Sequence, residues 1–325
     1  LSARSLVLDA ACASSLYAVA LACHYLHTKK TDLMLAGAVS AADPFFVNMG
    51  FSIFHAYAPH HQKFAPLDSK SGGLVSSEGA GIVVLKRLED AQWDGDKILG
   101  VIGGIGLSND GKGKFLLSPN PKGQKLAFER AYQLEDVLPQ NTSYLECHAT
   151  GTPLGDVTEL NSISDFFKEH NTAPLLGSVK SNMGHLLTAA GMTGLFKVLL
   201  SMEKGYIPPN VNLEKAVQTE NQFIKDEHII TRATPWKGQQ AGINSFGFGG
   251  TNAHMVVQAY NHKKAKPTDN IQLEAMSIVG MEAYFGDCTN LEDFYASIYN
   301  GHQHFRPLPP QRWKGFDANT SLLKA

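Results

Sequence analysis

One cysteine of this sequence stands where the chain could make a nucleophile. The apolar residues 6–8 predict a short buried strand, and the apolar spacing from Leu16 to Cys23 predicts a helix, so Cys12 falls at the turn between them. The positive end of a helix dipole at such a turn favours thiolate over thiol near neutral pH. Cys12 is therefore a candidate for covalent catalysis, with a buried structural cysteine as the alternative.

Three further groups of residues lie at the ends of predicted strands. His148 directly follows one strand, and Asp156 is placed to cap the next helix. Lys180 and His185 follow the next strand, and the glycine-rich residues 246–252 form a turn whose backbone could approach a ligand closely. Each group alone has an ordinary explanation, namely a core histidine, a buried ion pair or a hairpin. Only their combination with Cys12 indicates a site.

The elements that must position these groups alternate between strands and helices. Apolar runs and their spacing predict strands at 32–39, 81–88, 98–107, 143–147, 175–179, 241–245 and 251–258, and helices at 121–134, 157–167 and 183–202. The helix at 183–202 is apolar almost all round, which predicts burial between layers. Such alternation, with strands this apolar, indicates a layered α/β fold with mostly buried sheets.

Composition places the chain among ordinary globular proteins. It has 325 residues, 43% of them hydrophobic and 18% charged, with a net charge of -2, so we expect no nucleic-acid partner. Its four cysteines form no CxxC pair, which argues against a zinc knuckle and a disulfide scaffold and indicates a reducing compartment, most simply the cytoplasm. Asp9 and Lys197 interrupt the two longest apolar runs, so no membrane span is expected.

A change of composition near residue 260 predicts a domain boundary. Residues 1–260 carry all the groups described above, and 261–272 are polar, charged and contain proline, as a linker would. Residues 276–281 then read as a fresh first strand and 291–299 as a helix. We therefore predict the start of a second domain at 273–325, cut off at the last residue, and a chain that begins inside a larger protein.

In this order, Cys12, His148, His185 and the turn at 246–252 resemble the β-ketoacyl synthase (ketosynthase) family, which has the thiolase-like fold. The resemblance runs from about residue 5 to 258 and includes the stretches 65–68 and 78–81. The residues around Cys12 and the predicted second domain look most like the condensing subunit of polyunsaturated fatty acid synthases, where a ketosynthase precedes a chain-length-factor domain of the same fold. The resemblance implies a layered αβαβα architecture with the N-terminal portion of the ketosynthase domain missing.

The resemblance implies a β-ketoacyl-[acyl carrier protein] synthase, an acyltransferase. Cys12 would hold an acyl group delivered on the phosphopantetheine arm of an acyl carrier protein. His148 and His185 would donate hydrogen bonds as malonyl-carrier decarboxylates, and the enolate would attack the acyl group in a Claisen condensation. Lys180 would orient the site electrostatically. The family binds no cofactor and no metal of its own.

The resemblance also implies roles for residues around these four. Thr150 and Thr152 would bind the pantetheine arm, and Phe248 would gate the acyl pocket and, with Cys12, supply backbone amides to the oxyanion. The remaining substrate-binding residues would be Phe246, Gly249 and Asn252, and the structural residues near the site Asp156, Glu159 and Glu78. The implied partners are acyl carrier protein with its malonyl and acyl thioesters, and either a second copy or a chain-length-factor domain.

Other classes fit less well. A thiolase needs a second cysteine in the last turn, and 246–252 has none; the ketosynthase III branch has Asn where His185 stands. A cysteine hydrolase using Cys12 and His148 leaves residues 180–185 without a role. A non-catalytic fragment or scaffold stays open, because family members carry a large portion before the nucleophile and only 11 residues precede Cys12. Gly72 and Ser77 depart from the family's usual Asp and Gly, which we expect to affect only the packing of that loop.

Overall fold

The computed structural model describes residues 5–41, 45–59, 62–112, 118–260 and 276–305. Its main feature is one mixed sheet with the strand order β1-β2-β10-β3-β9-β8-β4-β5, in which β4 pairs in parallel with β5 and β8, and the other pairs are antiparallel. The strands are β1 (Met34–Ser40), β2 (Gly79–Arg87), β3 (Gly100–Asn109), β4 (Thr142–Glu146), β5 (Leu175–Gly177), β8 (Gln240–Gly247), β9 (Thr251–Gln258) and β10 (Met276–Phe285). A separate pair is formed by β6 (Tyr206–Ile207) and β7 (Thr234–Pro235).

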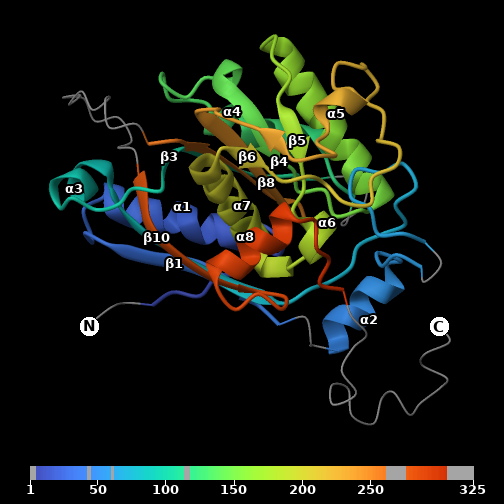
Figure 1. Cartoon of the computed structure of the whole chain (residues 1–325), viewed down its shortest axis with the longest axis horizontal. Coiled ribbons are helices and arrows are strands. Elements are labelled where there is room, and N and C mark those ends of the chain that lie inside the picture. Colours follow the sequence, from blue (N-terminus) through green and yellow to red (C-terminus); the bar gives the residue numbers. More distant parts are fainter. Residues whose placement is uncertain (1–4, 42–44, 60–61, 113–117, 261–275, 306–325) are drawn as a thin grey trace.

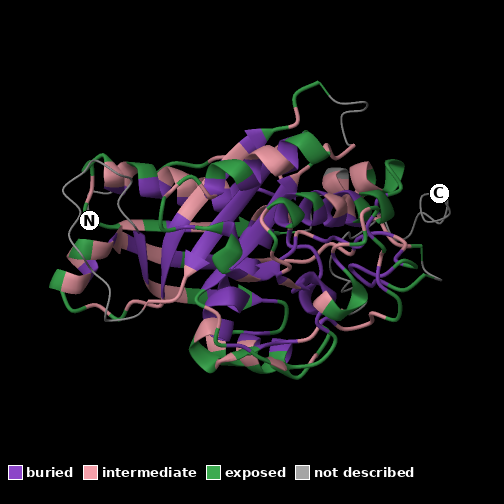
Figure 2. Ribbon diagram, turned by 90° about the horizontal axis from the view of Figure 1, so that it is seen from above, coloured by how far each residue is buried: buried purple, intermediate pink, exposed green. Residues whose placement is uncertain are grey.

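Helices pack against this sheet in two groups. The helices are α1 (Ser14–His27), α2 (Phe45–Ile53), α3 (Leu88–Trp93), α4 (Pro121–Ala131), α5 (Pro153–Glu169), α6 (Lys180–Met183), α7 (Ala190–Lys204) and α8 (Leu291–Tyr299). Helices α1 and α7 pack against each other and against the sheet, while α4 packs on β3 and β9 and against α5 (Figure 1). Strands β8 and β9 are consequently buried along nearly their whole length. Figure 2 shows buried residues concentrated in the middle of the molecule, where the sheet lies between helices.

Most elements lie where the sequence places them, and two do not. Residues 6–8 form no strand, and Val7 is fully exposed, because no strand of the described chain pairs with this stretch. The helix predicted at 183–202 begins only at Ala190, after α6 and a short 3-10 turn, since Gly184 and Leu187 both have positive φ angles. His185 therefore lies in an irregular turn ahead of the helix.

Strand β10 joins the sheet from far along the chain. It pairs antiparallel with β2 from Met276 to Phe285 and with β3 from Met276 to Ile278, so it lies between two strands of the first 110 residues (Figure 1). Helix α8 packs on β10 and α7. The predicted linker at 261–272 lies within the residues that the structure does not describe, and the division of the chain into two domains stays a prediction.

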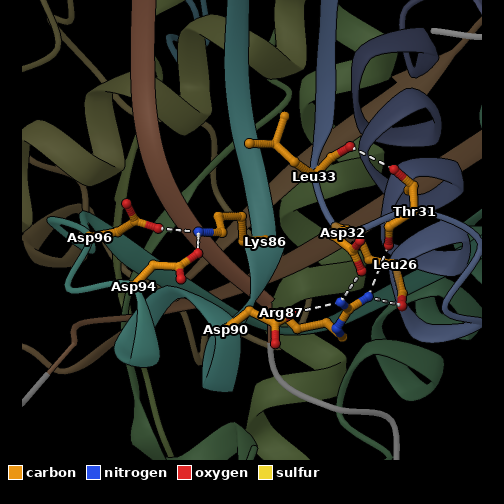
Figure 3. Close-up of polar contacts among 9 residues, drawn as sticks. All are labelled: Leu26, Thr31, Asp32, Leu33, Lys86, Arg87, Asp90, Asp94 and Asp96. Atoms are coloured by element: carbon orange, nitrogen blue, oxygen red, sulfur yellow. Dashed lines mark hydrogen bonds and ion pairs between the residues drawn. The ribbon is translucent and has the colours of Figure 1, made fainter. Parts of the chain in front are cut away.

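Arg87 fixes the helix that follows Cys12. It ends β2, is only 8% exposed, and its guanidinium donates to the backbone carbonyls of Leu26 at 3.0 Å and Thr31 at 2.9 Å (Figure 3). The same group pairs with Asp32 at 2.6 Å and with Asp90. A cation at the last carbonyls of a helix is favourable, because it satisfies acceptors that have no intrahelical partner. The C-terminal end of α1 is thereby tied to β2 and to the start of β1.

A buried ion pair links β4 to α7. Lys197 Nζ lies 2.9 Å from Glu146 Oε2, and both side chains are almost completely buried. Glu146 also accepts hydrogen bonds from the Tyr144 hydroxyl at 2.6 Å and from the backbone N–H of Val179 at 2.5 Å. Lys197, which interrupts an apolar run in the sequence, is thus compensated by a carboxylate from a neighbouring element.

We expect Lys197→Met to lower the free energy of unfolding by about 3 kcal/mol, because it leaves the Glu146 carboxylate buried without its cation. Urea unfolding followed by circular dichroism measures the change. The matched control is Lys125→Met, which removes a partly exposed pair with Glu169 and should change stability by less than about 1 kcal/mol. Equal effects of the two substitutions would contradict the interpretation.

Candidate active site

Cys12 lies in a tight turn that two strands hold in place. Ala11 has a φ of 50°, and helix α1 begins two residues after Cys12. The carbonyl of Cys12 accepts a hydrogen bond from Ser245 Oγ at 2.6 Å, and that of Ala10 accepts one from Thr251 Oγ1 at 2.8 Å. Since Ser245 and Thr251 belong to β8 and β9, the sheet itself fixes the position of the thiol, which is 6% exposed.

The structure brings together three side chains that are far apart in the sequence. His185 Nε2 lies 3.0 Å from Cys12 Sγ, and the rings of His148 and His185 lie edge to face with centroids 5.3 Å apart. One ring atom from each histidine and the sulfur all lie within 4.8 Å of one another. The three groups come from the turn before α1, from the end of β4 and from the segment between α6 and α7. A ligand of a few atoms could contact all three at once.

A buried carboxylate positions His148. Glu159, on α5, accepts hydrogen bonds from the backbone N–H groups of His148 and Ala149, both at 2.7 Å, and from Asn244 Nδ2 at 2.8 Å. The neighbouring Asp156 accepts from the backbone of Gly151 at 3.1 Å and of Leu67 at 2.8 Å. The prediction that Asp156 caps its helix is wrong, because α5 begins at Pro153 and places Asp156 in its first turn. Burial raises the pKa of Asp156 to about 7.

A short stretch before β2 positions His185. The backbone N–H of His185 donates to the carbonyl of Val75 at 2.7 Å, and its carbonyl accepts from the N–H of Ser77 at 2.9 Å. Gly184 has a φ of 77°, and a Cβ there would collide with Ser77 Oγ. Ser77, which stands where the family usually has Gly, thus contacts the backbone of the segment that carries His185. Its effect is therefore not limited to the packing of its own loop, as the sequence predicted. Glu78 follows it, half-buried and outside the cavity that Cys12 lines.

The electrostatics of the site favour neutral groups. Burial raises the pKa of the Cys12 thiol to about 11, although hydrogen bonds with the backbone of Phe248 and Cys12 and the charge of Lys180 act in the opposite direction. Loss of hydration therefore opposes the thiolate that the start of the helix predicts, and it outweighs the donors there in the free protein. Burial and the charge of Lys180 hold the pKa values of His148 and His185 well below the usual range, so both imidazoles are neutral.

Lys180 acts on this site through its charge. It is 2% exposed, and burial lowers its pKa, while the nearby carboxylates Glu146 and Glu159 act to raise it. Its ammonium group opposes protonation of both histidines and favours loss of the proton from Cys12. Lys180 does not line the cavity.

A cavity of about 330 Å³ opens in front of the thiol. It is lined by Cys12, both histidines and the whole predicted substrate-binding set, Thr150, Thr152, Phe246, Phe248, Gly249 and Asn252, and also by Asp156 and Glu159. A ligand in this cavity would reach the sulfur and both imidazoles. The volume suits a slender chain or arm.

Other residues of the cavity wall were not identified from the sequence. Asp110, just after β3, accepts a hydrogen bond from Asn252 Nδ2 at 2.7 Å, and its backbone N–H donates to the carbonyl of Gly250 at 2.8 Å. Phe54, Leu74 and Gln124 of α4 are among the other lining residues that the sequence did not indicate. Asp110 lies three residues after the predicted strand 98–107, and this polar residue near a strand end was a signal that the sequence offered.

The three central residues have side chains of the types that bind zinc. Within the described parts of the chain, Cys12, His148 and His185 are the one group of three such side chains close enough to hold a metal ion. Burial that keeps Cys12 a thiol works against metal binding, which needs the thiolate. The sequence-based expectation that the site works without a metal stays a prediction. Among the described residues, no helix is long and apolar enough to cross a membrane.

Comparison with known families gives a consistent result. The N-terminal domain of beta-ketoacyl synthases matches residues 1–91, their C-terminal domain matches 99–214, and the ketoacyl-synthetase C-terminal extension matches 225–304. The chain belongs to the β-ketoacyl synthase family. Its homologues are condensing enzymes of the acyltransferase class. The resemblance stated from Cys12, His148, His185 and the last turn is thereby confirmed.

Individual relatives come from two kinds of synthase. The chain is 38% identical to one subunit of the polyunsaturated fatty acid synthase of Thraustochytrium sp., over 97% of this chain and 16% of that protein. It is 37% identical to one subunit of the phenolphthiocerol/phthiocerol polyketide synthase of Mycobacterium tuberculosis, over 85% of this chain and 15% of that protein. The chain therefore spans about one sixth of the length of these relatives.

Solved structures confirm the fold class. The PfaC keto synthase-chain length factor superposes with a TM-score of 0.77 at 50% identity, covering 97% of this chain and 34% of that one. The ketosynthase from module 6 of the bacillaene synthase from Bacillus subtilis 168 gives a TM-score of 0.72 at 37% identity, covering 78% of this chain and 47% of that one. The chain described here therefore has the α/β, thiolase-like fold that was predicted.

The raised pKa of Cys12 predicts how its alkylation depends on pH. Because the thiolate is the nucleophile, the rate with iodoacetamide should rise about tenfold per pH unit from 7 to 10 and should not level off near 8.5, the pKa of a free cysteine. Lys180→Met should raise that pKa further and slow the reaction at every pH in this range. Peptide mass spectrometry of Cys12 measures both effects, with the exposed Lys63→Met as control. A plateau near pH 8 in the wild type would contradict the burial argument.

Proposed function

We propose that this ketosynthase joins an acyl group held on Cys12 to a malonyl group delivered by a carrier protein, with loss of carbon dioxide. The observation that supports the proposal is the placement of one thiol and two neutral imidazoles around a single cavity, with His185 Nε2 3.0 Å from Sγ. Such a set can hold a covalent acyl group and, beside it, stabilise a carbanion.

The first step is transfer of the acyl group to Cys12. Sγ attacks the carbonyl carbon of the incoming thioester, the bond to the carrier sulfur breaks, and the proton of the thiol ends on the departing carrier thiol. In the tautomer with the proton on Nε2, His185 donates to Sγ as the charge develops. The backbone N–H groups of Phe248 and Cys12, which interact with the sulfur in the free protein, are placed to stabilise the oxyanion.

The second step uses both imidazoles as donors. The malonyl thioester loses carbon dioxide, and the negative charge passes to its thioester oxygen, where His148 and His185 donate hydrogen bonds. The enolate carbon then attacks the acyl carbonyl on Cys12, the bond to Sγ breaks, and the departing thiolate takes a proton from water to restore the thiol. Neutral imidazoles suit this role, because a neutral ring donates a hydrogen bond to the enolate oxygen without giving up its proton to it. Their low pKa values keep them in this form.

The proposed substrates and partners rest on the cavity wall and on the relatives of the chain. Thr150 and Thr152, whose hydroxyls lie 3.0 Å apart on its wall, would bind the phosphopantetheine arm of the carrier protein. The relatives named for polyunsaturated fatty acid and polyketide synthesis support one of these pathways as the setting. We further propose that residues 273–325 begin a chain-length-factor-like domain, and that the protein pairs with such a domain or with a second copy. The similarity to the PfaC keto synthase-chain length factor, whose name contains both parts, supports this pairing.

The compartment is part of the proposal as well. Cys12, Cys23, Cys147 and Cys288 are all free thiols. Free cysteines are typical of reducing compartments, which supports a cytoplasmic location.

Cys12→Ala should abolish acylation of the chain. Intact-mass spectrometry after incubation with an acyl thioester should show the wild-type protein heavier by the mass of one acyl group. The variant should show no such increase. Cys23→Ala, which alters a buried cysteine of α1, is the matched control and should acylate normally. An adduct that persists in Cys12→Ala would rule out the assigned nucleophile, and a wild type without any adduct would favour a scaffold.

His148→Ala should separate the two steps. We expect acylation of Cys12 to remain, while release of carbon dioxide from a malonyl thioester falls by about 10²–10³-fold, the usual cost of removing one donor to a developing oxyanion. Radiolabelled carbon dioxide and the acyl adduct are measured on the same sample. A cysteine hydrolase would behave differently, because it would release free acid from the acyl thioester and no carbon dioxide from the malonyl one.

A further inference from the structure

Helix α4 carries a polar side chain on its buried face. The buried residues of this helix are Gly123, Gln124, Ala127, Phe128 and Ala131, which follow the spacing of one helical stripe. All of them except Gln124 are apolar or lack a side chain. Phe128, one turn further along, packs on Phe246 with ring centroids 6.3 Å apart. Gln124 therefore interrupts an apolar stripe at the end of the helix nearest the glycine-rich turn.

The amide of Gln124 is buried at the cavity and incompletely bonded. The side chain is 1% exposed, it lines the same cavity as Cys12, and its Oε1 has no hydrogen-bond partner. A buried acceptor without a partner costs about 1–3 kcal/mol. Within the described chain, the residues of the cavity wall that carry such an unpartnered atom are Gln124, His148 and His185. In the two histidines the unpartnered atom is Nδ1, and His185 meets Cys12 with its other ring nitrogen, Nε2.

From this we propose that Gln124 Oε1 accepts a hydrogen bond from the thioester substrate and forms a polar subsite of the cavity. The inference deepens the proposed condensing function and depends on it for the identity of the ligand. An apolar side chain at this position would continue the stripe at lower cost. The amide is therefore explained by a ligand that supplies the missing donor.

The chemistry of the ligand group is a hydrogen-bond donor, N–H or O–H. An amide carbonyl accepts either one. Two parts of the substrate can present such a group: an amide N–H of the pantetheine arm, and a hydroxyl on the acyl chain. Asp110 and Asn252, which lie near Gly123, hydrogen-bond to each other at 2.7 Å. The Gln124 carbonyl therefore stays available to accept a hydrogen bond from the ligand.

The test compares Gln124→Met with the wild type, because Met has nearly the same length and no acceptor of comparable strength. The ligands are unreactive thioethers in which a methylene separates the sulfur from the ketone, so that no acyl transfer occurs. Three are used: one with the pantetheine arm, one with a propyl group instead, and one with the arm and a hydroxyl on the chain. Isothermal titration calorimetry gives Kd for each. Ser201→Ala, which removes another buried unpartnered oxygen outside the cavity, is the control.

We expect Gln124→Met to bind the arm-bearing ligand about tenfold more weakly than the wild type and the propyl ligand equally well, if the arm supplies the donor. If the chain hydroxyl supplies it, only the advantage of the hydroxylated ligand is lost. Equal affinities in the variant and the wild type for all three ligands, or a uniform loss, would overturn the subsite. A melting temperature of Gln124→Met at or above that of the wild type excludes misfolding, and a rise is expected because the unpartnered acceptor is removed.

Failure of this inference can be told apart from failure of the proposed function. Binding of the thioethers requires no chemistry, whereas the acyl adduct on Cys12 does. Adduct formation together with unchanged affinities in Gln124→Met would remove the subsite alone. Specific loss of binding in the variant, in a chain that never acquires an adduct, would keep the subsite and contradict the condensing function.

Discussion

Two carboxylates buried near the end of β4 hold the site together. Glu146 binds the backbone of Val179 and pairs with Lys197, and Glu159 binds the backbone of His148 and Ala149. The segments that carry the two histidines are irregular, so they cannot satisfy their own backbone donors and need acceptors from elsewhere. Charged acceptors inside a protein are costly unless they are fully paired, which ties the shape of the site to the packing of β4, α5 and α7.

The sequence predicted the sheet and helices well because their signals are local. Apolar runs identified β1, β2, β3, β4, β8 and β9 within a few residues. The errors occur where the outcome depends on something distant or on single backbone angles. Residues 6–8 have the composition of a strand but gain no pairing partner in the described chain, and the start of α7 is displaced by the positive φ angles of Gly184 and Leu187. Neither effect is visible in hydrophobic periodicity.

The site was predictable in its members and less so in its chemistry. Motif resemblance identified Cys12, His148 and His185, and the structure places them together. The ionisation of Cys12 was not predictable, since it depends on the balance between burial and a few donors, and burial is a property of the whole fold. Gln124 and Asp110 were missed for a related reason: each looks like an ordinary polar residue until α4 and the glycine-rich turn enclose it.

Burial keeps both kinds of titratable group in this cavity, the imidazoles and the thiol, in their uncharged forms. It keeps both imidazoles neutral, the form in which we propose that they donate, and it favours the protonated thiol of Cys12 when no substrate is present. On the proposed mechanism, a Cys12 thiolate that forms only as it attacks would be protected from oxidants and stray electrophiles, because the thiolate is the reactive form. Lys180 adjusts this balance, since its charge favours the thiolate and disfavours the imidazolium. Loss of that single charge would therefore shift all three groups in the unfavourable direction at once.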